Sequence, residues 1–408
     1  MRARGALYVT YDGLLEPLGE SQVLGYVERL ARSYPMSVLS FEKPADLADR
    51  ARVSRMEGRL AGSGVRWIRR RYHKRPMLPA TGYDIARGVV AGLAAVGRGA
   101  IGLVHVRGYV PGAIGLSVAR ATGRAFVFDM RGFWPEEKVD AGHWTREGTP
   151  YRLAKRWERR FFEGADAIVS LTDAGVKRFP ELGYRLRPDV LVDVIPTCAD
   201  LAQFAPGPPD RALAARLGLE GRRVVGCVGT LSNWYLREPT LRYLAKLVRV
   251  LPDAVVLFVT REDHGALRAD AGRAGLPASR AVFARAEFAE MPAYLRLLDV
   301  AVFFIKMCFS KTASAPTRLA ELLGVGVPVV INDGIGDSGA IVRDHEAGVV
   351  LPQLDAASVA ASLPAVRRVL DDPQARARCA ATARRYFDVD EGTARYARLY
   401  DRLLGGRG

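Results

Sequence analysis

The fold can be inferred from two apolar runs, Val300-Ala-Val-Phe-Phe-Ile305 and Val327-Pro-Val-Val-Ile331, and from the segment that joins them. Within that segment, a helix is predicted over Pro316-Thr-Arg-Leu-Ala-Glu-Leu-Leu-Gly324, because proline suits a first helical position and glycine suits a C-terminal cap. Strands that are apolar on both faces and alternate with helices form parallel sheets covered on both sides. These residues therefore predict one β-α-β unit of an α/β domain.

Apolar runs of this kind alternate with helical segments along the chain, in two series. The first series comprises Ala6–Thr10, Met36–Phe41, Val65–Ile68, Ile101–Val106, Ala125–Asp129, Asp166–Leu171 and Val190–Ile195. The second comprises Arg223–Val228, Ala254–Thr260, Ala281–Ala284, Val300–Ile305, Val327–Ile331 and Gly348–Leu351. Between the two series, the prolines and the glycine of Gln203–Pro209 exclude regular structure.

This organisation predicts two Rossmann-like domains that face a central cleft. We expect the first domain over residues 1–200 and the second over residues 201–385, followed by a helix over residues 386–408 that could pack back on the first domain. In such sheets ligands bind beyond the carboxyl ends of the strands, and pockets favour domain interfaces. We therefore expect the loops that directly follow strands to line the site.

The composition is that of a soluble, basic, globular protein. Of the 408 residues, 49% are hydrophobic and 25% are charged, which excludes wholesale disorder. The apolar runs are too short to span a membrane, and the N-terminal residues lack a secretory signal pattern, so we expect a cytoplasmic protein. The cysteines are far apart and are expected to be buried free thiols, with no metal site: Cys198, Cys227, Cys308 and Cys379.

The net charge of +16 favours an anionic partner. Two basic segments stand out: a predicted loop over Arg69–Arg75, and one face of a predicted helix over Arg152–Phe162. A merely solvated face explains such a pattern about as well as attraction to anionic lipid headgroups does. Nucleic acid is not expected as a partner, because no zinc-finger spacing, aromatic RNA-binding signature or helix-turn-helix pattern is present.

The predicted helix that begins near Pro316 is a candidate phosphate site, because a helix N-terminus presents unpaired N–H groups and partial positive charge. Lys311 and Arg318 add full charges there, and Glu321 lies one turn deeper, about 6 Å along the helix axis. Hydroxyl groups are added by Ser310, Thr312, Ser314 and Thr317. The spacing suits a nucleoside diphosphate with its ribose at Glu321; the alternative is an exposed glutamate among turn-forming residues.

The sequence resembles the retaining glycosyltransferases of the GT-B fold in glycosyltransferase family 4, and within it the bacterial enzymes that build surface polysaccharides. Ser310–Val330 is similar to the family's donor-binding segment, and Val194–Phe204 is similar to its interdomain stretch. Gly226–Ser232 resembles the opening strand and glycine turn of the donor domain, and Asp12–Gln22 resembles the glycine loop of the N-terminal domain.

The resemblance implies that residues 226–345 bind a nucleotide-diphosphate sugar and that the N-terminal half binds the acceptor. It also implies transfer with retention, without a metal or another cofactor. Lys311 and Arg318 would then stabilise the departing diphosphate, and Glu321 would hold the ribose. Glycines allow close backbone approach, so the phosphate-binding turns are expected at Gly19 and at Gly229 with Thr230.

Two positions depart from the family pattern. The family's second glutamate, eight residues before Glu321, is Ala313 here. The arginine and lysine that commonly follow the glycine turn are missing, because Thr230–Tyr235 contains neither. Lys311 therefore becomes the preferred candidate for contact with the leaving phosphate.

In the N-terminal half, Asp129 ends an apolar strand and Arg131 follows it. The family often has a histidine near here. We expect Asp129 to position sugar or acceptor hydroxyls and Arg131 to assist with the phosphates or the acceptor. The alternative is that Asp129 caps the next element and pairs with Arg131.

The sequence thus predicts a hexosyltransferase acting on a lipid-linked or saccharide acceptor in cell-envelope polysaccharide synthesis. The basic segments predict peripheral docking on the inner face of the cytoplasmic membrane, where a lipid-linked acceptor would lie. The other functions that fit the residues are a non-catalytic nucleotide-sugar binder, which the missing carboxylate at Ala313 suggests, a sugar-nucleotide epimerase, and a polyanion-binding protein.

Overall fold

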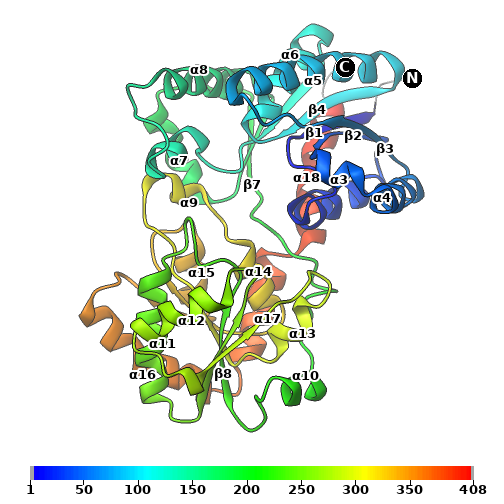
Figure 1. Ribbon diagram of the computed structural model, residues 1–408. Helices are drawn as coiled ribbons and strands as arrows, with labels where there is room; N and C mark the ends of the chain where they lie inside the picture. Colours follow the sequence, from blue (N-terminus) through cyan, green and yellow to red (C-terminus); the bar gives the residue numbers. More distant parts are fainter. Residues whose placement is uncertain (1–3, 406–408) are drawn as a thin grey trace. The chain divides into compact units, whose positions relative to one another are not determined.

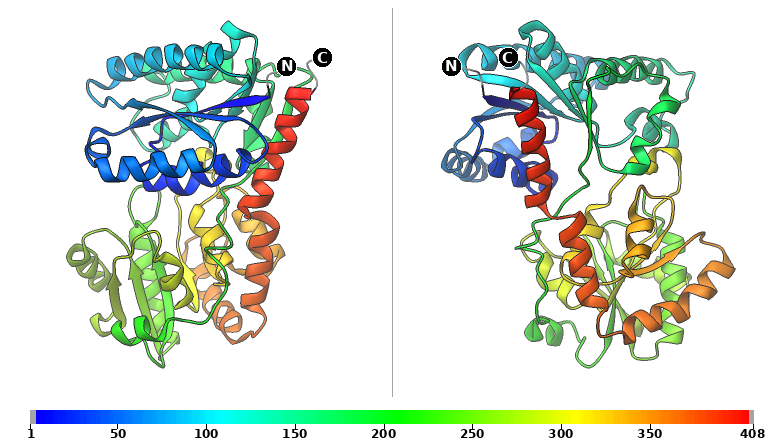
Figure 2. Two further views of the ribbon diagram at one scale, coloured as in Figure 1. Left: turned by 90° about the vertical axis from the view of Figure 1, so that its right-hand side faces the viewer. Right: turned by 180° about the vertical axis from the view of Figure 1, so that it is seen from behind.

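The computed structural model describes residues 4–405, except for the side chain of Pro17, and divides into two compact α/β units (Figures 1 and 2). One unit extends to Pro196 and includes the chain from Val389 onward, and the other is Thr197–Asp388. This confirms the predicted α/β class with two Rossmann-like domains. The predicted boundaries, 200/201 and 385/386, lie within four residues of these, and the predicted ends at 1 and 408 lie outside the described residues.

The first unit is built on a parallel sheet of seven strands in the order β3-β2-β1-β4-β5-β6-β7. Its strands are β1 (Gly5–Thr10), β2 (Met36–Glu42), β3 (Val65–Arg71), β4 (Ile101–Arg107), β5 (Ala125–Asp129), β6 (Ala167–Ser170) and β7 (Leu191–Val194). Strands β1, β2 and β5 are buried at every residue, as expected for a parallel sheet covered on both faces.

Helices cover both faces of this sheet. The longer ones are α4 (Arg50–Gly62), α5 (Met77–Arg98), α6 (Tyr109–Thr122), α8 (Thr149–Gly164) and α18 (Val389–Gly405). The shorter helices and turns are α1 (Pro17–Gly19), Glu20–Leu24, α2 (Gly25–Leu30), α3 (Pro44–Ala48), α7 (Trp134–Asp140), α9 (Asp173–Val176) and Phe179–Leu182. Helices α5, α6 and α8 form one layer, and α2, α4 and α18 lie on the opposite face (Figures 1 and 2). Helix α18 packs against α2 and β4, which is why the end of the chain belongs to this unit.

The second unit has a parallel six-stranded sheet in the order β10-β9-β8-β11-β12-β13. Its strands are β8 (Arg223–Val228), β9 (Ala254–Val259), β10 (Ala281–Ala284), β11 (Val300–Val302), β12 (Val329–Asn332) and β13 (Gly348–Leu351). Its helices are α10 (Arg211–Arg216), α11 (Arg237–Val250), α12 (His264–Arg273), α13 (Met291–Arg296), α14 (Thr317–Gly324), α15 (Ser338–Asp344), α16 (Ala356–Asp371) and α17 (Ala375–Tyr386), with single helical turns at Ala278–Arg280 and Phe309–Ala313.

Two predicted elements end differently in the structure. Strand β3 continues to Arg71, so the first half of the basic segment Arg69–Arg75 belongs to an edge strand and only the second half is a loop. Strand β11 stops at Val302 instead of Ile305, because the amide of Ile305 donates to the side chain of Asn332 and leaves the strand ladder. A hydrogen bond to a side chain thus replaces the next backbone hydrogen bond between β11 and β12.

The cysteines are free thiols, and Cys198, Cys227 and Cys379 are buried, as the sequence predicts. Cys308 differs from the prediction, because it is partly exposed. Among residues 4–405, no helix combines the length and the apolar composition that crossing a bilayer would need. Within the same range, His, Cys, Asp and Glu side chains form no group of three or more that could hold a metal ion.

Candidate functional site

A cavity of about 430 Å³ opens at the carboxyl ends of neighbouring strands in the second unit. Its lining comes from the residues that end or follow β8, β9 and β10: Gly229, Thr230, Val259, Thr260, Arg261, Glu262, Ala286 and Met291. Ligands of parallel sheets bind at this edge. The cavity therefore lies where the strand order predicts a site.

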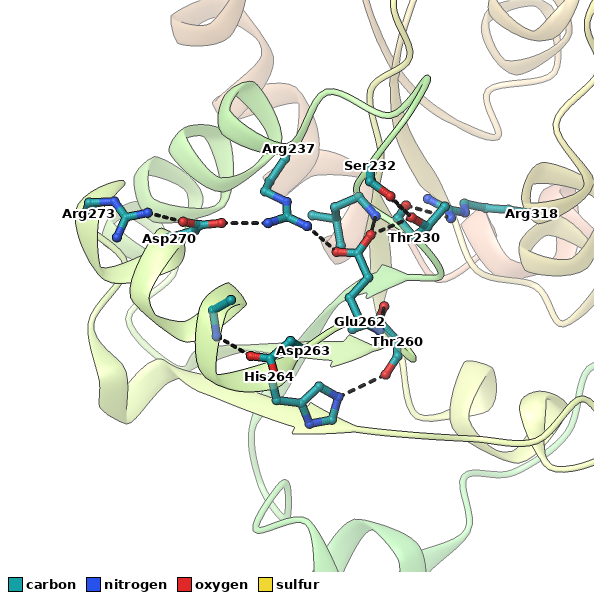
Figure 3. A network of polar contacts seen from close by, with 12 residues as sticks. Thr230, Ser232, Arg237, Thr260, Glu262, Asp263, His264, Asp270, Arg273 and Arg318 are labelled. Carbon is teal, nitrogen blue, oxygen red and sulfur yellow. Dashed lines mark hydrogen bonds and ion pairs between the residues drawn. The ribbon is translucent and has the colours of Figure 1, made fainter.

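The loop after β8 is fixed by Glu262, which follows β9 (Figure 3). The Glu262 carboxylate accepts hydrogen bonds from the Thr230 hydroxyl at 2.5 Å, the Leu231 amide at 3.0 Å and the Arg237 guanidinium at 2.6 Å. Although partial burial opposes the charge, these donors hold the pKa of Glu262 below its usual value. Arg237 is held in turn by Asp270 at 2.8 Å. Glu262 thus stays ionised and fixes the loop that lines the cavity.

Two cations reach this loop from residues that follow β11. The Lys311 ammonium lies 3.7 Å from the centroid of the Trp234 ring, and the Arg318 guanidinium carbon lies 3.8 Å from the centroid of the Tyr235 ring. Arg318 also donates to the carbonyl of Thr230 at 3.2 Å (Figure 3). An aromatic face attracts a cation without neutralising it. The loop that lacks its own arginine and lysine therefore carries two positive charges from elsewhere in the unit.

Gly229 cannot be replaced freely, for two reasons. Its φ of +80° lies in the left-handed region that favours glycine. A Cβ atom at this position would lie 2.2 Å from Nη2 of Arg318. Both the backbone conformation of the turn and the position of the Arg318 guanidinium therefore require a glycine at position 229.

Helix α14 begins at Thr317, one residue later than predicted, and Pro316 is its N-cap. No side chain caps its first N–H groups, which keep their partial positive charge. Glu321 is half-buried on this helix, and burial raises its pKa to about 7 against the opposing charge of Arg318. Within residues 4–405 no hydrogen bond to the Glu321 carboxylate is present. It is therefore a poorly solvated carboxylate near Arg318, not an ordinary exposed helix residue.

The predicted hydroxyl groups divide into two pairs. The Thr312 hydroxyl donates to the carbonyl of Phe309 at 2.7 Å, and the buried Ser310 lies 3.4 Å from the sulfur of Cys308. These two side chains shape the turn Phe309–Ala313. Ser314 and Thr317 are partly exposed beside the start of α14 and stay candidates for ligand contact.

In the first unit, Asp129 is buried at the end of β5. Tyr396 of α18 donates to its carboxylate at 2.9 Å, and Arg131 lies 3.7 Å away. Burial opposes the charge, but Arg131 and His105 lower the pKa of Asp129 below its usual value. The structure thus shows the pairing of Asp129 with Arg131 that the sequence left as an alternative, and contact with a ligand stays a prediction.

Gly19 has a packing reason to be glycine. It is buried, its φ is −62°, and a Cβ atom there would lie 2.0 Å from the carbonyl oxygen of Gly13. This close approach joins the first turn of α1 to the preceding loop. A role for the Gly19 amide in phosphate binding stays a prediction.

Sequence reasoning missed Glu262, Arg237 and the two aromatic rings that hold the cations. Glu262 carries a weak signal, because it comes directly after an apolar strand whose carboxyl end faces the site edge. Trp234 and Tyr235 occupy the segment in which the family's cations are missing. Their pairing with Lys311 and Arg318 joins residues more than seventy positions apart, which spacing alone does not reveal.

The raised pKa of Glu321 predicts a pH-dependent effect of Glu321→Gln. Because the pKa rises from 4.5 to about 7 on folding, the free energy of unfolding of the native protein falls as pH rises through this range. Glutamine does not titrate. The free energy of unfolding of E321Q, relative to that of the native protein, should therefore increase by up to about 3 kcal/mol between about pH 5 and about pH 8. Chemical denaturation at both pH values checks this. The control is E220Q, at an exposed glutamate. If the free energy of unfolding changes between the two pH values by the same amount in E321Q and in E220Q, the prediction is wrong.

Comparison with known proteins agrees with these observations. Residues 19–198 match the family model of the glycosyl transferase 4-like domain. No curated protein matches the sequence. Among solved structures, sucrose-phosphate synthase from Thermosynechococcus elongatus is 15% identical with a TM-score of 0.71, and the match covers 99% of this chain and 100% of that one.

Two further structures are similar over almost their whole length. HepE from Anabaena, in complex with UDP, is 16% identical with a TM-score of 0.70, covering 97% of this chain and 99% of that one. WaaG, a glycosyltransferase involved in lipopolysaccharide biosynthesis, is 16% identical with a TM-score of 0.65, covering 98% and 100%. At these identities the likeness shows the fold. The match over residues 19–198 shows a glycosyl transferase 4-like domain in that part of the chain, and the likeness to the solved structures shows the two-domain GT-B fold.

Proposed function

We propose that this enzyme transfers a hexosyl group from a nucleotide-diphosphate sugar to a lipid-linked or saccharide acceptor, with retention of anomeric configuration. The observation that carries the proposal is the charge arrangement at one sheet edge of the second unit. Arg318 donates to the carbonyl of Thr230, which lines a cavity of about 430 Å³. Lys311, the uncapped start of α14 and the half-buried Glu321 belong to the same segment as Arg318.

In this proposal the diphosphate of the donor binds at Lys311, Arg318 and the first N–H groups of α14. Glu321, one helical turn further on, accepts hydrogen bonds from the ribose hydroxyls and becomes fully ionised when it does so. The base enters the cavity at the ends of β9 and β10. HepE, which shares this fold, is described in complexes with UDP and with UDP-glucose, and this supports a donor of the same class.

The proposed mechanism follows from the negative charge that develops on the leaving nucleoside diphosphate when the glycosidic bond of the donor is cleaved. The bond from the anomeric carbon to the phosphate oxygen breaks, and the leaving nucleoside diphosphate gains a negative charge. Lys311 and Arg318 stabilise that charge, so we propose that transfer needs no metal ion. The acceptor hydroxyl forms its bond on the face that the diphosphate leaves, and its proton passes to a phosphate oxygen. Retention results, and positioning supplies the rest of the catalysis.

The Tyr235 ring leaves the charge of Arg318 available to a ligand. Among the described residues, no carboxylate pairs with Arg318, which is held by the Tyr235 ring and one backbone carbonyl. Glu262 and Arg237 do not reach the ligand in this scheme; they are positioning residues that keep the loop of Trp234 and Tyr235 in place. The site therefore replaces the family's arginine and lysine by cations from another segment.

For the acceptor, we propose a component of cell-envelope polysaccharide synthesis. WaaG, one of the similar structures, is described as a glycosyltransferase involved in lipopolysaccharide biosynthesis. The arginine-rich outer face of α8 supports a peripheral position on the inner face of the cytoplasmic membrane. A lipid-linked acceptor would be met at that surface.

A thermal-shift screen of UDP, GDP, dTDP and their sugars tests donor binding. One of these nucleotides, at 100 times its dissociation constant, should stabilise the protein by about 2.7 kcal/mol. Glu321→Ala should weaken its binding, because the ribose hydroxyls lose their acceptor. If no nucleotide raises the melting temperature, the proposed donor class is wrong.

Gly229→Ala should lower affinity for that nucleotide at least tenfold, because the added Cβ would displace the Arg318 guanidinium. The matched control is Gly221→Ala, a glycine with a φ of +66° and no atom within 4 Å of a Cβ placed there. Both variants have the backbone strain, and only the first disturbs the cation. Equal dissociation constants in G229A and G221A, measured by calorimetry, would refute the role of Arg318.

Lys311→Ala should lower turnover by two or three orders of magnitude, because the leaving diphosphate loses the stabilising charge of the ammonium. Release of nucleoside diphosphate from the donor, with water as the acceptor, measures this without knowledge of the natural acceptor. The control is Lys246→Ala, on the exposed face of α11. Activity of the native protein should persist in a chelator. If K311A releases nucleoside diphosphate at nearly the native rate, the proposed role of Lys311 is wrong.

A further inference from the structure

A histidine and an aspartate form a hydrogen-bonded pair at the carboxyl edge of the sheet in the first unit. Nδ1 of His73 lies 2.6 Å from Oδ1 of Asp84, and the amide of His73 donates to Oδ2 at 2.9 Å. His73 follows β3 by two residues, and Asp84 belongs to the first half of α5. The side chain of Asp84 is 1% exposed and that of His73 is 36% exposed. The pair therefore joins a buried acid to an imidazole that solvent reaches.

Tyr11, which directly follows β1, is the third member of this cluster. Its hydroxyl donates to Oδ2 of Asp84 at 2.8 Å. Burial and the bond to Asp84 hold the pKa of Tyr11 above its usual value, so the phenol stays a donor. The carboxylate thus accepts hydrogen bonds from residues that follow two different strands.

The loop after β1 is held across the end of β2, the strand that lies between β1 and β3. The buried carboxylate of Glu42, the last residue of β2, accepts hydrogen bonds from the amides of Leu14 at 3.0 Å and Leu15 at 3.2 Å. Ligands of parallel sheets bind beyond this edge. The cluster of Tyr11, His73 and Asp84 therefore lies where the first unit would receive a ligand.

The position of Asp84 decides which nitrogen of His73 is available. A carboxylate that already accepts from a hydroxyl and an amide also acts as an acceptor toward Nδ1. The hydrogen of the neutral imidazole is then on Nδ1, and Nε2 keeps its lone pair. In the part of the chain that the structure describes, no residue forms a hydrogen bond with Nε2, so the pair also lacks the nucleophile of a hydrolytic triad. His73 thus presents an oriented acceptor that fits a ligand hydroxyl.

The cluster also contains tyrosine rings. The centroid of the Tyr83 ring lies 5.1 Å from that of His73, edge to face, and Tyr83 is 49% exposed. Arg87, one helical turn later, donates to the Tyr83 hydroxyl at 3.0 Å and so holds this side chain. Tyr72 is half-buried, and its ring lies 5.2 Å from that of Tyr11. Sites for small molecules combine aromatic side chains with a few directed polar groups in this way.

We propose that this cluster binds a sugar ring of the acceptor, with a sugar hydroxyl donating to Nε2 of His73 and the apolar face of the ring against Tyr83. A sugar carries both hydroxyl donors and C–H groups, so it satisfies the polar and the aromatic parts of the cluster. A phosphate or carboxylate fits less well, because the lone pair on Nε2 gives it no hydrogen to accept. The inference rests on the proposed function, since it names the residues of the first unit that receive the acceptor.

Saturation-transfer difference NMR on the full chain, with methyl glycosides of glucose, galactose, mannose and N-acetylglucosamine, tests this site. At least one glycoside should bind the native protein. His73→Gln keeps a polar atom near the position of Nε2 and should change the dissociation constant by no more than about threefold. His73→Asn keeps a donor toward Asp84 but has no atom at Nε2, so it should weaken binding about tenfold or more. The matched control, His143→Asn at an exposed histidine, should bind like the native protein.

A purely structural pair predicts the opposite order, because H73N keeps the bond to Asp84 and H73Q loses it. Native-like glycoside binding by H73N would overturn the inference, and so would the failure of every glycoside to bind the native protein. The thermal shift with the nucleotide should be the same in H73N, H73Q and the native protein, since the second unit binds it. Glycoside binding without any nucleotide binding would leave this inference standing and remove the proposed function. Nucleotide binding without glycoside binding would do the reverse.

Discussion

The second unit depends on the contact between two cations and two adjacent aromatic rings. Lys311 and Arg318 come from the turn and helix after β11, and Trp234 and Tyr235 come from the loop after β8. A ring face holds a cation in place and leaves its charge available to a ligand. The arrangement supports the proposed anion site at this edge of the second sheet.

Hydrogen bonds around the two cations and the two rings hold the loop after β8 in place. Glu262, which follows β9, accepts a hydrogen bond from the amide of Leu231 in the loop after β8. It also accepts one from Arg237, which belongs to α11 (Figure 3). Gly229 leaves the space that the Arg318 guanidinium occupies. Glu321 stays poorly solvated one turn along α14, so its proton affinity can respond to a bound ligand. Positioning and charge thus come from different residues, which is why their substitutions should have separable effects.

The fold was predictable because its strands are continuous apolar runs, such as Ala254–Val259, whose type does not depend on distant residues. The start of α14 and the position of Glu321 were predictable for the same local reason. The pairing of Lys311 with Trp234 was not, because it depends on how two loops meet.

The central claim is that Arg318, together with Lys311, binds the phosphates of the donor and not its nucleoside. Calorimetry of Arg318→Gln with the nucleoside diphosphate that binds, and with its parent nucleoside, tests this most directly. We predict that the variant loses affinity for the diphosphate and binds the nucleoside as the native protein does. Equal losses for both ligands, or no loss for either, would contradict the account.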